Sequence, residues 1–227
     1  MENLKALTEA VCCVAREAGH FLKEERKSFR REVVQEKHAH DYVSYVDKAS
    51  EKKVVSALRK LLPEAGFIAE EGSAAYSDET YCWVVDPLDG TTNYIHDNAP
   101  YCVSIALRDK QSLLLGVVYE PCRDECFYAW KGGGAYVNGE RLRVSLVSEL
   151  KDAFVVTELP YNFEQYARTG EHLIHELYGK VAGIRMNGSA ALALCYVAAG
   201  RFDAWLEAFI GKWDFSAAAL MVLEAGG

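Results

Sequence analysis

The sequence predicts a mixed α/β fold in which helices and sheets are stacked in layers. Apolar residues recur at helical spacing over about the first 25 residues, which is typical of an amphipathic helix. Short apolar runs separated by turn residues fill positions 101–144, which is typical of an antiparallel meander. After position 150 short strands alternate with helices, and such alternation indicates stacked α and β layers.

The first half of the chain opens with this helix, whose apolar stripe is Leu4, Leu7, Val11, Val14, Ala18 and Leu22. The elements predicted next are a strand, a helix and two strands, over residues 42–47, 48–62, 66–69 and 83–85. Asp47 then lies at a strand-to-helix junction, where a helix N-cap is the alternative to a catalytic role. Pro87 has no N–H for a sheet and is expected to end its strand, which leaves Asp86 at the strand end.

The second half continues with the meander, in which Asn138-Gly139 predicts a hairpin turn. The elements predicted after it are a strand, a helix, a strand, a helix, a strand and a helix, at residues 153–157, 164–178, near 184, 189–199, 203–207 and 215–224. Asp214 comes directly before the last of these helices, and Glu207 ends the last strand.

Composition narrows the function classes. The chain has 227 residues, a net charge of −8 and no basic run, which argues against nucleic-acid and anionic-membrane partners and favours small molecules. Seven cysteines without framework spacing indicate a reducing compartment, and no run approaches the ~20 apolar residues of a membrane span, so we expect a cytoplasmic protein.

The strongest chemical signal lies at residues 86–93, Asp-Pro-Leu-Asp-Gly-Thr-Thr-Asn. Asp86 and Asp89 are close enough to face one site, and two such carboxylates repel each other unless a cation or a proton lies between them. Gly90 permits close approach of the backbone to a ligand, and the N–H groups around Thr91 suit an anion such as phosphate. The alternative is a simple turn, because Asp-Pro and Asp-Gly are also ordinary turn residues.

Two further motifs accompany this one. Glu70-Glu71 follows an apolar run, and Trp213-Asp214 precedes an Ala-rich helix that ends in Glu-Ala-Gly-Gly at residues 224–227. In this order and over residues 4–227, the sequence resembles the inositol monophosphatase family of metal-dependent, lithium-sensitive phosphatases. The resemblance implies an αβαβα sandwich of the inositol monophosphatase and fructose-1,6-bisphosphatase type. It implies one phosphatase domain over residues 1–227, with lobes of about 1–147 and 148–227.

The resemblance also implies a set of metal ligands and catalytic residues. Two or three Mg²⁺ ions, with Mn²⁺ as the alternative, would be held by Glu70, Asp86, the carbonyl of Leu88, Asp89 and Asp214. Asp47 would accept a hydrogen bond from Thr91, whose hydroxyl orients the attacking water, and Glu70 would assist in catalysis. These ligands are all hard oxygen atoms, which favours Mg²⁺ or Mn²⁺ over zinc.

The substrate contacts implied by the resemblance are the backbone N–H groups of Gly90 and Thr91 for phosphate, and Gly188, Ser189, Ala190 and Glu207 for hydroxyl groups. For Glu207 the alternative is a solvated or salt-bridged carboxylate. A carboxylate that accepts from ring hydroxyls favours inositol 1-phosphate. Phosphatases for 3'-phosphoadenosine 5'-phosphate or for sugar bisphosphates are the alternatives within the superfamily. The resemblance further implies a homodimer.

Two hypotheses from other classes of protein compete with this one. Asp-Gly-Thr-Thr resembles the end of the signature of aspartyl-nucleophile phosphatases, but Pro87 stands where the nucleophilic aspartate should be, so the spacing rejects this class. The family continues past Glu-Ala-Gly-Gly with another strand and helix, whereas this sequence stops at Gly227. A catalytically impaired binding or assembly module is therefore a second hypothesis.

Overall fold

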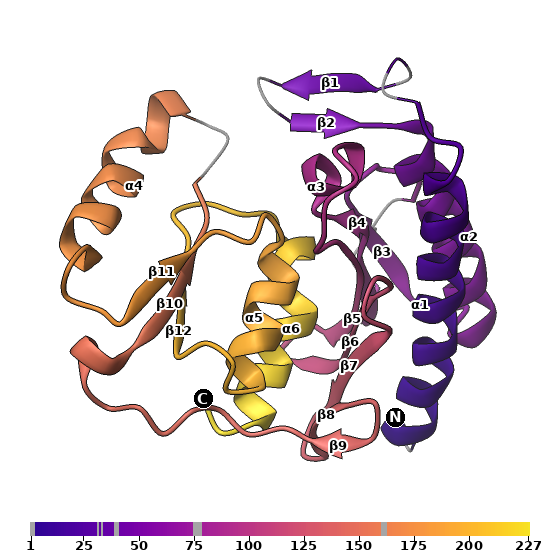
Figure 1. Ribbon diagram of the computed structural model, residues 1–227. Helices are drawn as coiled ribbons and strands as arrows, with labels where there is room; N and C mark the ends of the chain where they lie inside the picture. Colours follow the sequence, from indigo (N-terminus) through magenta and orange to yellow (C-terminus); the bar gives the residue numbers. More distant parts are fainter. Residues whose placement is uncertain (1–2, 31, 33, 39–40, 75–78, 160–162) are drawn as a thin grey trace.

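Five layers of helix and sheet lie side by side in the computed structural model (Figure 1). The structure describes residues 3–30, 32, 34–38, 41–74, 79–159 and 163–227. In Figure 1 the layers run from α1 and α2, through a seven-stranded sheet, α5 and α6, and a three-stranded sheet, to α4. The predicted αβαβα sandwich is confirmed.

The seven-stranded sheet has its strands in chain order, β3-β4-β5-β6-β7-β8-β9. Their bounds are Gly66–Ala69, Tyr81–Asp89, Cys102–Asp109, Leu113–Glu120, Glu125–Trp130, Gly134–Val137 and Glu140–Arg141. β3 and β4 are parallel, and every later neighbour pair is antiparallel. The predicted meander is thus confirmed, and at its β8–β9 turn both Asn138 and Gly139 have positive φ, 48° and 92°.

Helices cover both faces of this sheet. α1 (Leu4–Arg26) and α2 (Tyr45–Leu61) pack on one face, where the predicted stripe of α1 is buried at Val11 and Leu22. α5 (Ala190–Ala198) and α6 (Lys212–Glu224) pack on the other, and every residue of α5 is buried. A Cβ at Gly116 of β6 would lie 2.3 Å from the carbonyl oxygen of Ala217, so the absence of a side chain there lets α6 approach the sheet closely.

The small sheet has the parallel order β11-β10-β12, and α4 lies beyond it. Its strands and this helix span Phe154–Thr157 (β10), Gly183–Arg185 (β11), Ala204–Leu206 (β12) and Phe163–Leu177 (α4). A separate antiparallel pair consists of β1 (Gln35–His38) and β2 (Asp41–Val43), so the strand predicted over residues 42–47 is confirmed only at residues 42–43. Short helices occur at Thr91–Ile95 (α3) and Leu150–Asp152.

The prediction that Pro87 ends its strand was wrong. β4 continues to Asp89, with a register shift opposite β5 where Asp86 pairs with Ser104 and Asp89 with Cys102. Three residues on β4 therefore span the same length as two on β5, which is the pattern of a β-bulge. Pro87 is accommodated because it lies inside the bulge, where its missing N–H is not needed for the ladder.

Two helix starts were also predicted too late. α2 begins at Tyr45 rather than at residue 48, and its N-cap is Ser44, so Asp47 lies in the first turn and is not the cap. α6 begins at Lys212 rather than at residue 215, which places Asp214 in its first turn. In both helices the aspartate accepts a hydrogen bond from the N-cap backbone N–H, a stabilising contact that apolar periodicity does not reveal.

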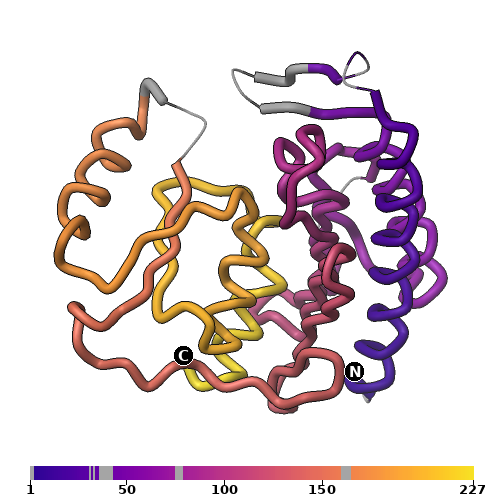
Figure 2. Tube along the Cα trace, viewed as in Figure 1, coloured from indigo at the N-terminus to yellow at the C-terminus, as the bar shows by residue number. Residues whose placement is uncertain are grey.

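The two ends of the described chain lie toward the same end of the layers, as the tube in Figure 2 shows. Within the part of the chain that the structure describes, no helix combines the length and the apolar character needed to cross a membrane.

Candidate active site

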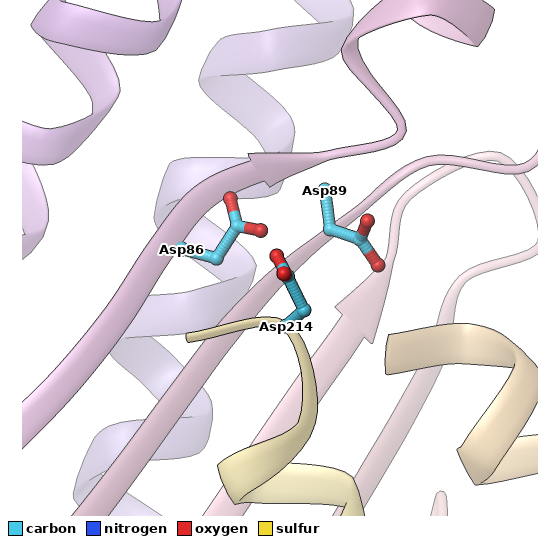
Figure 3. A group of neighbouring side chains, drawn as sticks. All are labelled: Asp86, Asp89 and Asp214. Carbon is cyan, nitrogen blue, oxygen red and sulfur yellow. The ribbon is translucent and has the colours of Figure 1, made fainter. Parts of the chain in front are cut away.

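Three carboxylates converge at the end of β4. Asp86 and Asp89 come from the strand and Asp214 from the first turn of α6, and Figure 3 shows Asp86 and Asp214 directed toward one another with Asp89 beside them. One oxygen from each lies within 4.8 Å of the other two. Residues three apart on a regular strand would face opposite sides of the sheet. The bulge adds one residue between them, and this brings both aspartates to the same side.

The cluster is electrostatically unfavourable by itself. Burial, followed by the charges of Glu70, Asp89 and Asp214, raises the pKa of Asp86 well above its usual range. The backbone N–H of Leu88 donates to Asp86 Oδ1 at 2.9 Å. A divalent cation would remove the repulsion among these groups, and carboxylate oxygens are the ligands that Mg²⁺ and Mn²⁺ prefer. The residues present therefore fit such an ion.

Glu70, the further predicted ligand, lies just after β3. Its backbone N–H donates to the carbonyl of Val85 at 3.2 Å, which extends the pairing of β3 with β4 by one residue. Glu70 is outside the group whose oxygens lie within 4.8 Å of each other among the described residues. Its charge nevertheless acts on Asp86, as the second cause of the raised pKa of that residue. Glu70 is therefore near the cluster.

A hydroxyl–carboxylate pair adjoins the cluster. Thr91 Oγ1 lies 3.2 Å from Asp47 Oδ1 and 2.9 Å from the carbonyl oxygen of Leu88. Asp47 Oδ2 accepts from the N–H and the hydroxyl of Ser44, at 2.8 and 2.7 Å. Burial raises the pKa of Asp47, and the hydrogen bonds from Ser44 and Thr91 act in the opposite direction. Leu88 thus links this pair to Asp86, because its N–H donates to Asp86 and its carbonyl accepts from the Thr91 hydroxyl.

The turn at Gly90 is sterically tight. Gly90 has φ 88° and precedes α3, a short helix that begins at Thr91 and that the sequence did not predict. A Cβ at this position would lie 3.0 Å from the carbonyl oxygen of Pro100 and 3.1 Å from that of Gly188. Both the left-handed backbone and the lack of space require glycine here.

The predicted substrate turn, residues 188–190, is bonded directly to the carboxylate cluster. Ser189 is the N-cap of α5, and its hydroxyl donates to Asp89 Oδ2 at 2.6 Å. The backbone N–H of Ala191 donates to the same oxygen at 2.8 Å, and the thiol of Cys102 lies 3.7 Å from it. Burial raises the pKa of Asp89, and the donors at Ser189 and Ala191 oppose that rise. Sequence reasoning did not predict this link.

Glu207 follows β12 and faces the same region. Its Oε2 is buried without a hydrogen-bond partner among the described residues. Burial, then the charges of Glu158, Asp89 and Asp214, raise the pKa of Glu207 to about 9. Among the described residues, no ion pair includes Glu207.

Three polar residues that hold the site were missed. Glu158 accepts from the backbone N–H groups of Asn187 and Gly188, at 2.5 and 2.8 Å. Ser50 donates to the carbonyl of Pro87 at 3.1 Å, and Glu51 is fully buried against the loop that follows Glu70. A signal existed for Ser50 and Glu51, because both fall within the apolar stripe of α2, where polar residues are unusual.

The fold and the site together define a layered α/β protein with a buried carboxylate centre suited to divalent metal ions. Residues 3–227 match the model of the inositol monophosphatase family. The chain is 41% identical over 214 residues, 94% of its length and 80% of the relative's, to the Nus factor SuhB of Escherichia coli (strain K12). It is 37% identical over 227 residues, 100% of its length and 86% of the relative's, to the fructose-1,6-bisphosphatase/inositol-1-monophosphatase of Aquifex aeolicus.

A solved structure agrees with these relatives. The crystal structure of the extragenic suppressor protein SuhB from Bartonella henselae matches with a TM-score of 0.91 and 37% identity, over 98% of this chain and 86% of that one. The chain belongs to the inositol monophosphatase family, and it is a phosphatase. The family is metal-dependent and acts on phosphorylated substrates, which agrees with the carboxylate cluster of this chain.

Proposed function

We propose that this chain hydrolyses phosphomonoesters with Mg²⁺, and that inositol 1-phosphate is its substrate. The observation that carries the proposal is the cluster of Asp86, Asp89 and Asp214 beside the Asp47–Thr91 pair. A phosphatase without a covalent nucleophile needs charge neutralisation and an oriented water, and these two groups lie next to each other.

Residues of the cluster would hold the ions. Glu70, Asp86 and the carbonyl of Leu88 would bind one ion, and Asp86, Asp89 and Asp214 the second, with a third near Glu70. When bound, Mg²⁺ neutralises charge on the phosphoryl oxygens and lowers the pKa of a coordinated water. Support comes from the burial of Asp86 among negative groups, which disfavours the empty, ionised cluster.

The Asp47–Thr91 pair would orient the water and hold its proton. When Thr91 donates to Asp47 Oδ1, the lone pairs of its hydroxyl are available to accept from water. Ser44 fixes Asp47 from the other side, so the carboxylate cannot rotate away from Thr91. Because burial raises the pKa of Asp47, this carboxylate is a better proton acceptor than an exposed one.

The substrate groups would be divided between two turns. Backbone N–H groups of Gly90 and Thr91 would bind the phosphate, and residues 188–190 with Glu207 would contact the hydroxyls of the substrate. Glu207 has a buried oxygen without a described partner, and the charges that shift its pKa are all negative. Such surroundings favour a neutral polyol that carries one phosphate over a substrate with a second phosphate nearby.

Phosphate release tests the proposal. With Mg²⁺, turnover of inositol 1-phosphate should exceed that of 3'-phosphoadenosine 5'-phosphate and of fructose 1,6-bisphosphate, and chelation should abolish all three activities. Glu207→Gln should raise KM for inositol 1-phosphate, whereas Glu140→Gln, an exposed change on β9, should not. If a bisphosphate is the best substrate, the polyol assignment is wrong and the wider phosphatase function remains.

Three further properties belong to the proposal, and the family resemblance supports the first two. Lithium at millimolar levels should inhibit when Mg²⁺ does not saturate the second ion site, and unchanged activity would argue against this. The chain should sediment as a homodimer. We also expect it in the cytoplasm, without nucleic acid or membrane as partners. The net charge of −8 supports this expectation, because a negative protein is repelled by nucleic acid and by anionic membranes.

A binding or assembly role is the second candidate, because the Escherichia coli relative at 41% identity is called a Nus factor. The two functions differ in a simple observation. A folded protein that binds divalent cations but releases no phosphate from the three substrates would favour the binding role.

A further inference from the structure

A fully buried glutamate clamps the loop that follows Glu70. Glu51 has 0% exposure, and its two carboxylate oxygens each accept one backbone N–H. The N–H of Glu71 donates to Oε2 and that of Ser73 to Oε1, both at 2.7 Å. Bonds between backbone N–H groups and a carboxylate are among the stronger hydrogen bonds in proteins, and burial keeps water from competing for them.

Glu51 belongs to the same helix as Asp47, the carboxylate that lies 3.2 Å from the Thr91 hydroxyl. It lies one helical turn after Asp47 on α2, so both carboxylates project from one face. Between them, Ser50 contacts the carbonyl of Pro87 in the bulge of β4. One rigid helix thus touches three parts of the site, which are Thr91, the bulge and the loop after Glu70.

Hydrogen bonds hold the chain on both sides of Glu70. On one side Glu70 is tied to the sheet by its N–H bond to Val85 at 3.2 Å. On the other side the chain turns through Gly72, with φ 72°, and the two N–H bonds to Glu51 hold this turn. The charge of Glu70 acts on Asp86, and Glu70 lies outside the 4.8 Å carboxylate group of the described residues. A shift of this loop would therefore move Glu70 relative to Asp86.

We propose that Glu51 is a positioning residue, which holds Glu70 toward Asp86 and thereby sets the affinity of the carboxylate cluster for divalent cations. The inference rests on the proposed function, because it takes the cluster as a cation site. Glu51 itself contacts neither substrate nor ion in this role. It acts through the backbone of residues 71 and 73.

Direct cation binding tests the role without activity. Mn²⁺ is titrated into metal-free protein, and free Mn²⁺ is measured by electron paramagnetic resonance. Glu51→Gln keeps the shape but leaves one acceptor oxygen, and its amide N–H₂ would face a backbone N–H. Residues that orient a metal ligand without touching the ion typically contribute about 10- to 100-fold to metal affinity, so the Kd for Mn²⁺ should rise by that factor.

The chain offers a matched control in Glu120. This residue is also 0% exposed, and it accepts two backbone N–H groups, those of Cys122 and Arg123, at the β6–β7 turn. Glu120→Gln therefore removes the same kind of contact away from the cluster. Its Kd for Mn²⁺ should equal that of the parent, which separates a local effect on Glu70 from general destabilisation.

A double-mutant cycle tests whether Glu51 acts through Glu70. Glu70→Gln should weaken Mn²⁺ binding, and adding Glu51→Gln in that background should cause less than a twofold further change. Coupling of this kind is expected only when two residues serve one interaction. Equal effects of Glu51→Gln in both backgrounds would overturn the proposal.

The outcomes for the cation site and for Glu51 are distinguishable. A parent protein that does not bind Mn²⁺ refutes the cation site and with it the proposed function. A parent that binds, with an unchanged Kd in Glu51→Gln, refutes the positioning role alone. If Glu51→Gln does not fold, Gly72→Ala replaces it, because this change strains the same loop at φ 72° with open space around the new methyl group. A Kd unchanged in folded Gly72→Ala also refutes the role.

Discussion

Two buried carboxylates on the same sheet illustrate opposite solutions to burial. Glu120, at the β6–β7 turn, is 0% exposed and accepts from two backbone N–H groups, at 3.2 and 2.8 Å. Burial raises its pKa, and the backbone N–H and the charge of Arg123 oppose that rise. Asp86, at the bulge of β4, is 2% exposed, and burial followed by the charges of Glu70, Asp89 and Asp214 raises its pKa. The first carboxylate is satisfied by the protein, and the second is arranged for a cation.

The difference shows how stability and function are separated within one sheet. A buried carboxylate that the backbone satisfies stabilises a turn, and its removal leaves unpaired N–H groups. A buried carboxylate surrounded by like charges destabilises the metal-free protein, and the local structure persists because the sheet and α6 hold it from both sides. Substitutions at the two places should therefore have opposite consequences.

Asp86→Asn should give the largest effect. Turnover of a phosphomonoester should fall by about 1,000-fold or more, which is about 4 kcal/mol, because the ligand proposed to be shared by two metal ions is lost. In the presence of chelator, however, the variant should be more stable than the parent toward urea, since one of the repelling charges is removed. A variant with near-normal turnover, or one less stable than the metal-free parent, would show that Asp86, like Glu120, mainly stabilises the fold.

Thr91→Val should reduce turnover by about 100-fold, the lower end of the range for acid–base groups. The change keeps the shape but removes the hydroxyl that lies 3.2 Å from Asp47. Thr91→Ser, which restores the hydroxyl, should recover most of the activity, and Mn²⁺ affinity should change little in either variant. Equal activity of the Val and Ser variants would show that this hydroxyl has no part in catalysis.

Glu207→Gln should change the pH dependence of stability. The pKa of Glu207 is raised from 4.5 to about 9, so the folded protein keeps a proton that the unfolded chain loses above pH 4.5. Stability of the parent is therefore lost as pH rises from about 4.5 to about 9. The glutamine variant lacks this dependence, and in urea unfolding its advantage over the parent should grow by up to about 1 kcal/mol per pH unit between pH 6 and 8. If the free energies of unfolding of the parent and the variant change with pH in parallel, the raised pKa of Glu207 is contradicted.

Glu120→Gln should give the smallest effect on function. The free energy of unfolding should fall by about 1–2 kcal/mol, because a buried N–H at the β6–β7 turn loses its acceptor. Turnover at saturating Mg²⁺ should remain that of the parent. A loss of activity beyond twofold at a temperature where the variant is fully folded would show that the turn and the cluster are coupled.

Much of the architecture could be predicted from local sequence. The period of apolar residues located α1, the meander and the alternating elements after residue 150, because periodicity reflects which side of an element is buried. The left-handed Gly90 was likewise predictable from residue type, since a turn with φ 88° strongly disfavours a side chain. The prediction of a strand end at Pro87 failed because a bulge depends on the partner strand as well as on the proline.

By itself, the sequence determined which chemical groups are available, namely the carboxylates at residues 70, 86, 89 and 214 and the hydroxyl of Thr91, together with the short spacing that keeps Asp86 and Asp89 near each other. Only the tertiary structure decided that the β4 bulge turns these two aspartates to one side, that α6 brings Asp214 to them, and that Glu51 and Ser189 hold the surrounding loops. The physical reason is that these contacts join residues from about 20 to over 120 positions apart, and hydrogen bonds between such distant groups form only when packing of the apolar layers has already brought their elements together.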